Sequence, residues 1–385
     1  MTKSGAALLL YEDDDLKLVF NSHGRDDCFV TFTSWGKGHV NGFGQQFLDP
    51  RKVSGLYFIS KWDHWWHTAG MAEAIAIGKA ALEAVGFKRI IVYGASMGGY
   101  GAALHAVDFR AALGILIAPQ FEIRPDLPPN EQRWMREAQK IAFSNRTISS
   151  ELSRRVPFYV IFDPCSRDLA HVELFEQVTD VTRVPVPFGD HTPGVMLAQV
   201  GMLKDLVFDI INGRFDYNLF LKTLRQNRRK SAVFWGTLAD YTNKRWPRLA
   251  FYAVEQASQL DAKNVVYKLR YTYLLLTAKR LDEALEIARV SCALAPDHPA
   301  PWRALAKTYG ALGRHQEAVE AAREAVKRRM NDADLQRVLL DALIAAQDFN
   351  EAEKVAERAI ELDPKFARTI DLLKSIRSRL QEAMM

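Results

Sequence analysis

The stretch that most constrains the fold is RIIVYGASMGGYGAALHA, residues 89–106, where an apolar run ends abruptly in small residues around one serine. Residues 90–93 are typical of a fully buried strand, and the residues after the serine are typical of an apolar helix. The chain must therefore turn from strand to helix within a few residues. Such a turn strains the backbone of Ser96, and it leaves no room for side chains at Gly94 and Gly98.

The pattern G-x-S-x-G between a buried strand and a helix resembles the nucleophile elbow of the α/β-hydrolase superfamily. The resemblance implies an α/β-hydrolase fold, a mostly parallel sheet flanked by helices, with Ser96 as the nucleophile. The same five residues also suit a glycine-rich turn with a capping serine, as found in other α/β proteins. Acidic and histidine partners elsewhere in the chain must decide between the two interpretations.

Two aspartates are candidates for the acid of a catalytic triad. A strand is predicted at residues 157–162, Asp163 follows it directly, and Asp168 stands at the mouth of the next helix. The resemblance implies that the acid lies in the loop after this strand. We favour Asp168, because the positive end of the helix dipole would keep it ionised. Asp163, which could instead brace the loop, is the alternative acid.

One histidine stands where the resemblance implies the general base. His191 lies in the glycine-bounded loop GDHTPG after the last predicted strand, residues 183–188, whose prolines suit the edge of a sheet. The order Ser96, Asp168, His191 is the order of the superfamily's triad. The sequence therefore predicts a serine esterase, acting as an acyl hydrolase or an acyltransferase.

The N-terminal part of the chain also predicts where the oxyanion hole lies. Strands are expected at residues 7–11, 16–20, 28–35, 56–60 and 111–118, and helices at residues 71–85 and 195–211. A glycine-rich loop follows the third strand. In the superfamily this loop donates one backbone N–H to the oxyanion, so the resemblance implies Trp35 or Gly36 as the first donor and Met97 as the second.

The loop KWDHWWHTAG, residues 61–70, is unusually aromatic. Its tryptophans are Trp62, Trp65 and Trp66. They either offer faces to a sugar ring or an acyl chain of the substrate, or plug the underside of the loop. The loop also holds an aspartate and two histidines, but it lacks a clear set of metal ligands, so neither a metal nor a cofactor is expected.

A polar, proline-rich segment after the strand at residues 111–118 is expected to form a small cap over an open cleft. Its candidate substrate contacts, each of which also suits a solvent-facing position, are Arg124, Arg133, Trp134 and Arg136. Such caps shape substrate choice in the superfamily that the elbow resembles.

The second half of the chain repeats with a period of 34 residues. Small residues recur in register at Ala284, Ala318 and Ala352, at Ala288, Ala322 and Ala356, and at Ser291, Ala325 and Ala359. The middle unit has the fuller signature Trp302, Leu305, Tyr309, Ala318 and Ala325. This pattern resembles the tetratricopeptide repeat (TPR), an all-α solenoid of stacked helix pairs.

The expected organisation follows from this period. We predict a hydrolase domain at 1–214, a basic helical linker at 215–230, a degenerate repeat at 231–264, full repeats at 265–298, 299–332 and 333–366, and a capping helix at 367–385. The resemblance implies that the concave face of the repeats binds a protein partner. A short array could instead dimerise the chain or brace the first domain.

Composition excludes several classes of function. The formal net charge of +5 is small for 385 residues, so no nucleic-acid partner is expected. The N-terminal apolar run is too short for a signal peptide or a membrane span. Three widely spaced cysteines fit reduced thiols, and we expect a cytoplasmic protein.

The substrate is expected to be a small-molecule or glycan acyl ester. The combination of TSW, the HWW loop and GASMGGYGA with tetratricopeptide repeats is similar to bacterial proteins associated with surface-polysaccharide production. That similarity implies an ester carried by a carbohydrate. The alternative is a catalytically silent adaptor or scaffold, in which the repeats recruit a partner and the first domain has lost its activity.

Overall fold

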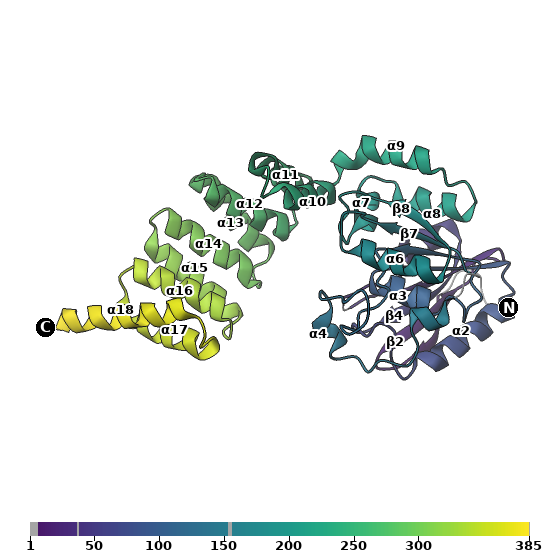
Figure 1. Ribbon diagram of the computed structural model, residues 1–385, viewed down its shortest axis with the longest axis horizontal. Coiled ribbons are helices and arrows are strands. Elements are labelled where there is room, and N and C mark those ends of the chain that lie inside the picture. Colours follow the sequence, from purple (N-terminus) through teal and green to yellow (C-terminus); the bar gives the residue numbers. More distant parts are fainter. Residues whose placement is uncertain (1–6, 37, 153–155, 385) are drawn as a thin grey trace. The chain divides into compact units, whose positions relative to one another are not determined.

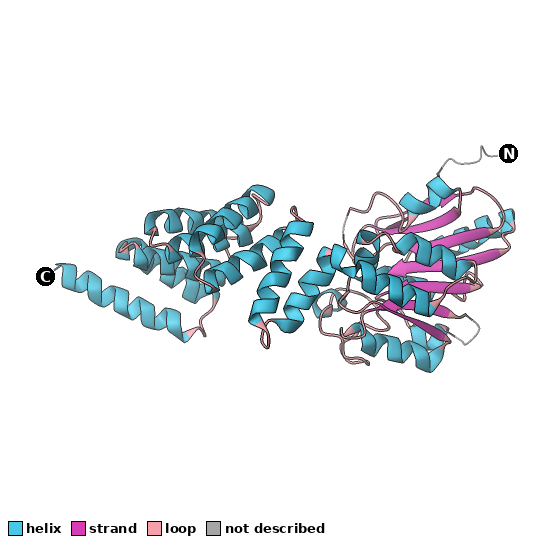
Figure 2. Ribbon diagram, turned by 90° about the horizontal axis from the view of Figure 1, so that it is seen from above, coloured by secondary structure: helices cyan, strands magenta, loops and turns pink. Residues whose placement is uncertain are grey.

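The computed structural model describes residues 7–36, 38–152 and 156–384 (Figure 1). The chain divides into two compact units, the first ending at Thr237 and the second beginning at Leu238. The first unit combines a sheet with helices, and the second is helical (Figure 2). Residues 1–6 of the predicted first domain and Met385 of the predicted capping helix lie outside the described residues.

The first unit is built on a mixed sheet with the strand order β1-β2-β4-β3-β5-β6-β7-β8. The strands are β1 (Leu8–Glu12), β2 (Leu16–Asn21), β3 (Asp27–Phe32), β4 (Ser54–Ser60), β5 (Arg89–Ala95), β6 (Leu113–Ile117), β7 (Phe158–Phe162) and β8 (Val181–Pro185). Strand β2 pairs antiparallel with β1 and β4, and the pairs from β4 to β8 are parallel. Parallel strands end at one edge of the sheet, so the loops after β3, β5, β6, β7 and β8 meet there.

The strands lie close to their predicted positions, with two differences. Strand β3 ends at Phe32, so Trp35 belongs to the following loop. Strand β8 begins at Val181 and ends at Pro185, earlier than predicted. It pairs with β7 at one edge of the sheet, where the missing backbone N–H of Pro185, its last residue, is tolerated.

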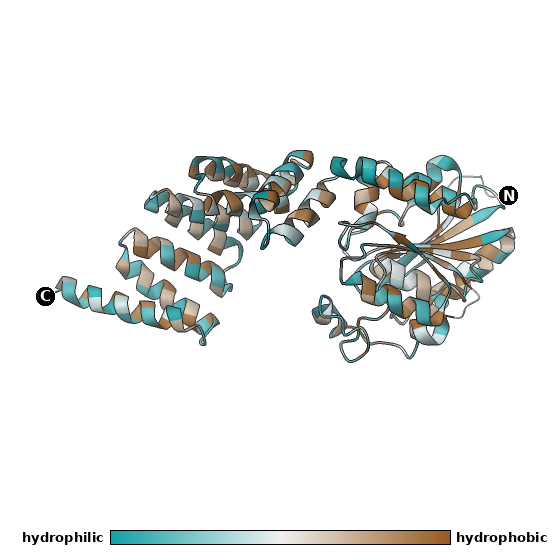
Figure 3. Cartoon of the chain, turned by 45° about the horizontal axis from the view of Figure 1, so that its top comes forward, coloured by the Kyte–Doolittle hydropathy of each residue, from teal (hydrophilic) through white to brown (hydrophobic). Residues whose placement is uncertain are grey.

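Helices cover both faces of the sheet. The helices of the first unit are α1 (Gln45–Leu48), η1 (Asp49–Arg51), α2 (Met71–Val85), α3 (Met97–Leu104), α4 (Met135–Ala138), α5 (Ile148–Glu151), α6 (Asp168–Val178), α7 (Pro193–Gln199), α8 (Leu203–Ile211), α9 (Tyr217–Asn227) and η2 (Arg228–Lys230). Helices α2, α3 and α6 share one apolar core with the sheet. On the other face Gly194 of α7 lies against Ile117, and Phe208 of α8 against Phe47. Figure 3 shows the apolar strands between these helices.

Two predictions for the end of the first unit need correction. The single helix predicted at 195–211 is divided into α7 and α8, because Gly201 takes a positive φ of 76° between them. The segment 215–230 is part of the first unit, since α9 buries Phe220 and Leu224. The first unit therefore extends beyond the predicted boundary at residue 214.

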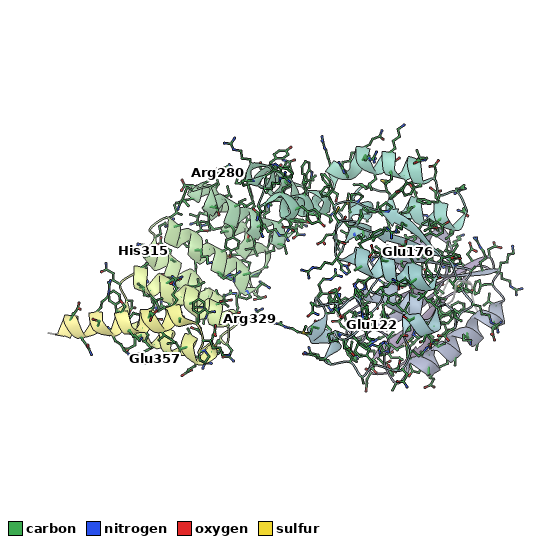
Figure 4. The ribbon with its side chains drawn as sticks, in the orientation of Figure 1. Glu122, Glu176, Arg280, His315, Arg329 and Glu357 are labelled. Carbon is green, nitrogen blue, oxygen red and sulfur yellow. The ribbon has the colours of Figure 1, made fainter. Side chains whose placement is uncertain are left out.

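The second unit is a stack of helix pairs. Helix α10 (Ala232–Thr242) leads into it and is followed by α11 (Pro247–Leu260), α12 (Val265–Thr277), α13 (Leu281–Leu294), α14 (Pro299–Ala311), α15 (His315–Arg328), α16 (Ala333–Ala345), α17 (Phe349–Leu362) and α18 (Ala367–Met384). Buried alanines let the helices of a pair approach closely, for example Ala322, Ala356 and Ala288. Arg280 and His315, labelled in Figure 4, stand where the second helices of two pairs begin.

The pairs α12/α13, α14/α15 and α16/α17 coincide with the three predicted 34-residue units. In the part of the chain that the structure describes, no helix has both the length and the apolar character needed to cross a bilayer.

Candidate active site

Strand β5 leads into a sharp turn that presents Ser96 at the start of α3. Ser96 has a φ of 52° and a ψ of −122°, a strained backbone conformation for a residue with a side chain, and its N–H donates to Ile117 O at 2.9 Å. A Cβ at Gly94 would overlap the carbonyl oxygen of Gly98, and a Cβ at Gly98 would overlap that of Phe32. Glycine is therefore required at both positions, for the steric reason that the sequence pattern implies.

Three side chains from three loops form a continuous hydrogen-bonded chain. The Ser96 Oγ lies 2.9 Å from His191 Nε2, and His191 Nδ1 lies 2.9 Å from Asp168 Oδ2. Asp168 is fully buried, whereas the His191 side chain is 21% exposed. Since Nδ1–H donates to the carboxylate, Nε2 is left free to accept the proton of the serine hydroxyl.

The two candidate acids have different roles in the structure. Asp168, the first residue of α6, contacts His191 directly. Asp163 accepts the N–H of Cys165 at 2.9 Å and the N–H of Asp190 at 2.8 Å, so it braces the loop that carries His191. Burial raises the pKa of Asp163 above its usual value. Geometry thus brings Asp168, and not Asp163, to the imidazole.

A glutamine that the sequence analysis did not single out completes the polar contacts of the serine. Gln120 follows β6, is fully buried, and donates from Nε2 to Ser96 Oγ at 3.0 Å. The same nitrogen lies 3.3 Å from His191 Nε2. The one sequence feature that could have pointed to Gln120 is its position. It follows a strand whose carboxyl end lies at the same sheet edge as Ser96.

An arginine from the predicted cap lies against Asp168. Arg133 Nη2 is 2.8 Å from Asp168 Oδ1, and Arg133 Nη1 is 3.4 Å from His191 Nδ1. Arg133 is held by two hydrogen bonds to Glu131 Oε2, of 2.6 and 2.9 Å. The same oxygen lies 3.0 Å from Nε2 of the buried His171, whose Nδ1 accepts the N–H of Phe121.

This network keeps both carboxylates ionised although they are buried. Burial alone would raise the pKa of Asp168, but hydrogen bonds from His191 and the charge of Arg133 hold it below its usual value. Burial likewise opposes ionisation of Glu131, yet hydrogen bonds from His171 and Arg133 hold its pKa well below the usual range. Of the other predicted cap contacts, Arg124 pairs with Glu122, labelled in Figure 4, at 2.6 Å, and Arg136 is exposed.

The predicted oxyanion donors lie in two loops at this edge. Met97 is the first residue of α3, so its N–H has no acceptor within the helix. The N–H of Gly36 is already donated to Asp63 Oδ1 at 2.7 Å. Within residues 7–36, 38–152 and 156–384 the N–H of Trp35 makes no such bond, which favours Trp35 over Gly36 as the first donor.

The tryptophans of the 61–70 loop do not form a ligand surface, and this prediction needs correction. Trp65 is fully buried, and Trp66 is 1% exposed. Trp66 Nε1 donates to Met97 O at 3.0 Å and its ring packs against Gly101, so it supports the turn from beneath. Trp62 donates to Asp15 Oδ1 at 2.7 Å. Trp65 and Trp66 therefore plug the underside of the loop, which was the other interpretation of the pattern, whereas Trp62 is half-buried.

Two other tryptophans form an aromatic cluster with His191. The ring of Trp134 is centred 5.8 Å from that of His191 and 5.6 Å from that of Trp35. Trp35 is 47% exposed, so part of its indole is open to solvent. Trp65 packs behind Trp134, with ring centres 5.5 Å apart.

A second feature lies in the helical unit. A pocket of about 330 Å³ is lined by the first helices of successive pairs, α14 and α16, and by α18. Its cations are Arg303, Lys307, Arg337 and Arg368, and its acids are Asp334 and Asp341. Arg337 and Arg368 pair with acids of the same unit, whereas among the described residues Arg303 and Lys307 form no ion pair.

Comparison with known proteins identifies the helical unit. Residues 302–331 and 338–366 match the tetratricopeptide repeat family. Similar solved structures include a MamA protein, 16% identical over 38% of this chain and 81% of that chain, with a TM-score of 0.35. The first TPR domain of human RPAP3 is 21% identical over 31% of this chain and 93% of that chain, with a TM-score of 0.30. The Sgt2 TPR domain from Aspergillus fumigatus is 20% identical over 31% of this chain and 80% of that chain, with a TM-score of 0.30.

No curated protein matches the chain. The prediction of C-terminal tetratricopeptide repeats in an all-helical solenoid is confirmed. The first unit is a mixed sheet with helices, which these matches do not assign to a family.

Proposed function

We propose that the first unit is a serine hydrolase of the α/β-hydrolase type that cleaves or transfers the acyl group of an ester. The observation that supports this most directly is the hydrogen-bonded chain from Ser96 through His191 to Asp168, with successive distances of 2.9 Å. The positive φ of Ser96 at a strand-to-helix turn fits the same proposal.

In the proposed reaction, Ser96 Oγ attacks the carbonyl carbon of the ester while His191 Nε2 takes the hydroxyl proton. Asp168 stabilises the imidazolium that forms. The backbone N–H groups of Met97 and Trp35 stabilise the oxyanion of the tetrahedral intermediate. His191 then gives the proton to the leaving alcohol oxygen, and an acyl-enzyme results.

Water or the hydroxyl of an acceptor completes the cycle by attacking the acyl-enzyme carbonyl as His191 takes its proton. Collapse of the second tetrahedral intermediate returns the proton to Ser96 Oγ. We infer that the acyl ester is carried by a carbohydrate, because the exposed indole of Trp35 beside Trp134 offers the kind of flat apolar surface on which a sugar ring packs.

Labelling with a fluorophosphonate probe tests the nucleophile. We expect wild type to be labelled and both Ser96→Ala and His191→Ala to lose labelling. Ser144→Ala is a matched control, because Ser144 Oγ also lies 2.9 Å from a histidine nitrogen, that of His67. Labelling that persists in Ser96→Ala would assign another nucleophile. An unlabelled wild type that also fails to cleave aryl esters would favour the silent adaptor.

We further propose that the repeats bind a protein partner through an acidic segment. Arg303 and Lys307 line the pocket without an ion pair among the described residues, and Arg303 Nε has no hydrogen-bond partner there. Carboxylates of a bound peptide would supply both the missing ion pairs and the missing hydrogen-bond acceptor.

Peptide binding tests this proposal. We expect the full chain to bind a fluorescent Asp/Glu-rich decapeptide more tightly than its Asn/Gln counterpart, and the double variant Arg303→Glu/Lys307→Glu to remove the difference. Lys327→Glu on α15 is the control, and equal binding of the two peptides would contradict the proposal.

A further inference from the structure

The Asp168 carboxylate is shared between the imidazole of His191 and the guanidinium of Arg133. His191 Nδ1 lies 2.9 Å from Asp168 Oδ2 and 3.0 Å from Oδ1, and Arg133 Nη2 lies 2.8 Å from the same Oδ1. Arg133 is in turn fixed by Glu131, which is 6% exposed and contacts His171. Both carboxylate oxygens already lie near His191 Nδ1, so orienting the imidazole does not require the additional guanidinium at Oδ1.

We propose that Arg133, held by Glu131, is a positioning residue that sets the proton affinity of His191 through Asp168. This inference rests on the proposed function, because it concerns the base that activates Ser96. Arg133 is not a catalytic residue in this scheme, since its guanidinium faces Asp168 and the Nδ1 side of His191, away from the nitrogen that contacts Ser96.

The direction of the effect follows from the charges. The imidazolium of His191 is stabilised by the negative charge of Asp168, and Arg133 partly neutralises that charge. Its guanidinium, 3.4 Å from Nδ1, also repels the imidazolium directly. Both interactions disfavour the imidazolium relative to the neutral imidazole. Glu131 opposes them, because its carboxylate offsets the charge of Arg133.

The groups that take part come from three elements. Asp168 and His171 lie on α6, His191 lies in the loop before α7, and Arg133 and Glu131 lie in the segment after β6. These are the charged and titratable groups that face one another here. Ser96 and Gln120, which also contact His191, are neutral.

The test uses two variants with opposite expected effects. The rate of fluorophosphonate labelling is measured as a function of pH. The pH at which the rate falls to half on the acidic side is then compared between each variant and wild type; this pH is called the midpoint. Arg133→Gln should move the midpoint to higher pH by about one unit. Glu131→Gln should move it to lower pH, because Arg133 then acts on Asp168 without its counter-charge. Arg146→Gln is the matched control, an arginine between β6 and β7 that pairs with Asp108 and Glu151, and it should leave the midpoint in place.

A second readout does not depend on activity. The titration of the His191 imidazole is followed by NMR in each full-length variant, with the resonance assigned by its loss in His191→Gln. Opposite shifts in Arg133→Gln and Glu131→Gln support the inference even if wild type is not labelled, in which case the proposed function alone fails. The inference is overturned if the midpoints do not move, or if both variants shift in the same direction. Arg133 would then only brace the structure. If Arg133→Gln does not fold, the downward shift in Glu131→Gln decides alone.

Discussion

The two units of the chain form their functional surfaces in different ways. In the first unit, Ser96 and His191 are 95 residues apart in the sequence and meet only because parallel strands end at one edge of the sheet. In the second unit, the packing contacts join neighbouring helices, and one pattern of small residues serves every pair. A repeated local pattern is visible to comparison with known proteins. A site assembled from distant loops leaves only separate short patterns in the sequence, and its geometry becomes visible in three dimensions.

The units also differ in how they use charge. Asp168 and Glu131 are buried, and their partners fix their ionisation and orientation. The ion pairs of the helical unit are mostly exposed, such as Arg358 with Glu361, and pairs of this kind contribute little to stability. We therefore expect single substitutions to have large effects in the first unit and small effects in the second.

The largest expected effect separates the two aspartates of the first unit. Asp168→Asn should lower the rate of labelling about 10⁴-fold, because an amide neither fixes the imidazole tautomer nor stabilises the imidazolium. Asp163→Asn should lower it less than about tenfold, since Asp163 acts through the loop that it braces. Labelling rates of both purified variants at pH 7 measure the difference. Equal losses would show that the loop, and not contact with His191, decides activity.

Gly94→Ala should destabilise the first unit by about 3 kcal/mol, because the added Cβ would overlap the backbone of Gly98. Urea denaturation monitored by hydrogen exchange of each unit measures the change. The second unit should retain its protection. A first unit as stable as wild type would mean that the turn can relax, contrary to the steric argument for glycine.

Acid should destabilise the first unit selectively. Burial lowers the pKa of His64 to about 4 and of His67 to about 3, from 6.5. The unfolded chain therefore binds protons that the folded unit excludes, so stability is retained above pH 6.5 and falls as the pH drops toward 4, by about 3 kcal/mol for each histidine. Unfolding midpoints between pH 7 and 4.5 measure this loss.

Two substitutions sharpen the pH experiment. His67→Gln should reduce the dependence of stability on pH, because glutamine does not bind the proton. His315→Gln, at an exposed position of the helical unit, should leave it unchanged. If acid weakened the helical unit equally, the buried histidines would not be the cause.

The smallest expected effect lies in the second unit. Gly310→Ala should stabilise it by about 0.5 to 1 kcal/mol, because Gly310 is in helix α14 and a Cβ there would meet no atom within 4 Å. Thermal unfolding measures the gain. A loss of thermal stability would indicate that position 310 needs the conformational freedom of glycine. The two glycines, Gly94 and Gly310, would then both be required.

The sequence predicted those features that depend on neighbouring residues. Helix α2 begins and ends where its alanine-rich pattern predicts, and the three full repeats agree with their helix pairs. Ser96, Asp168 and His191 could be placed because each follows a strand in a recognisable loop. Gln120 and Glu131 carry no local pattern, and their role depends on which loops meet at the sheet edge.

Burial in loops was the hardest feature to predict. The sequence of the 61–70 loop fits both an exposed aromatic surface and an internal plug, and only the position of α3 above it decides that Trp66 is covered. The boundary of the first unit was missed for a similar reason. The buried face of α9 depends on contacts with the sheet unit that its basic sequence does not reveal.

The short segment between β6 and α4 combines two tasks in adjacent residues. Trp134 lies beside His191, and Arg133 contacts Asp168. A change of this segment that reshapes the approach to the serine would also disturb the charge at the acid. Under the proposed scheme, ligand preference and the working pH range would therefore evolve together, and a homologue with a different segment here should differ in both.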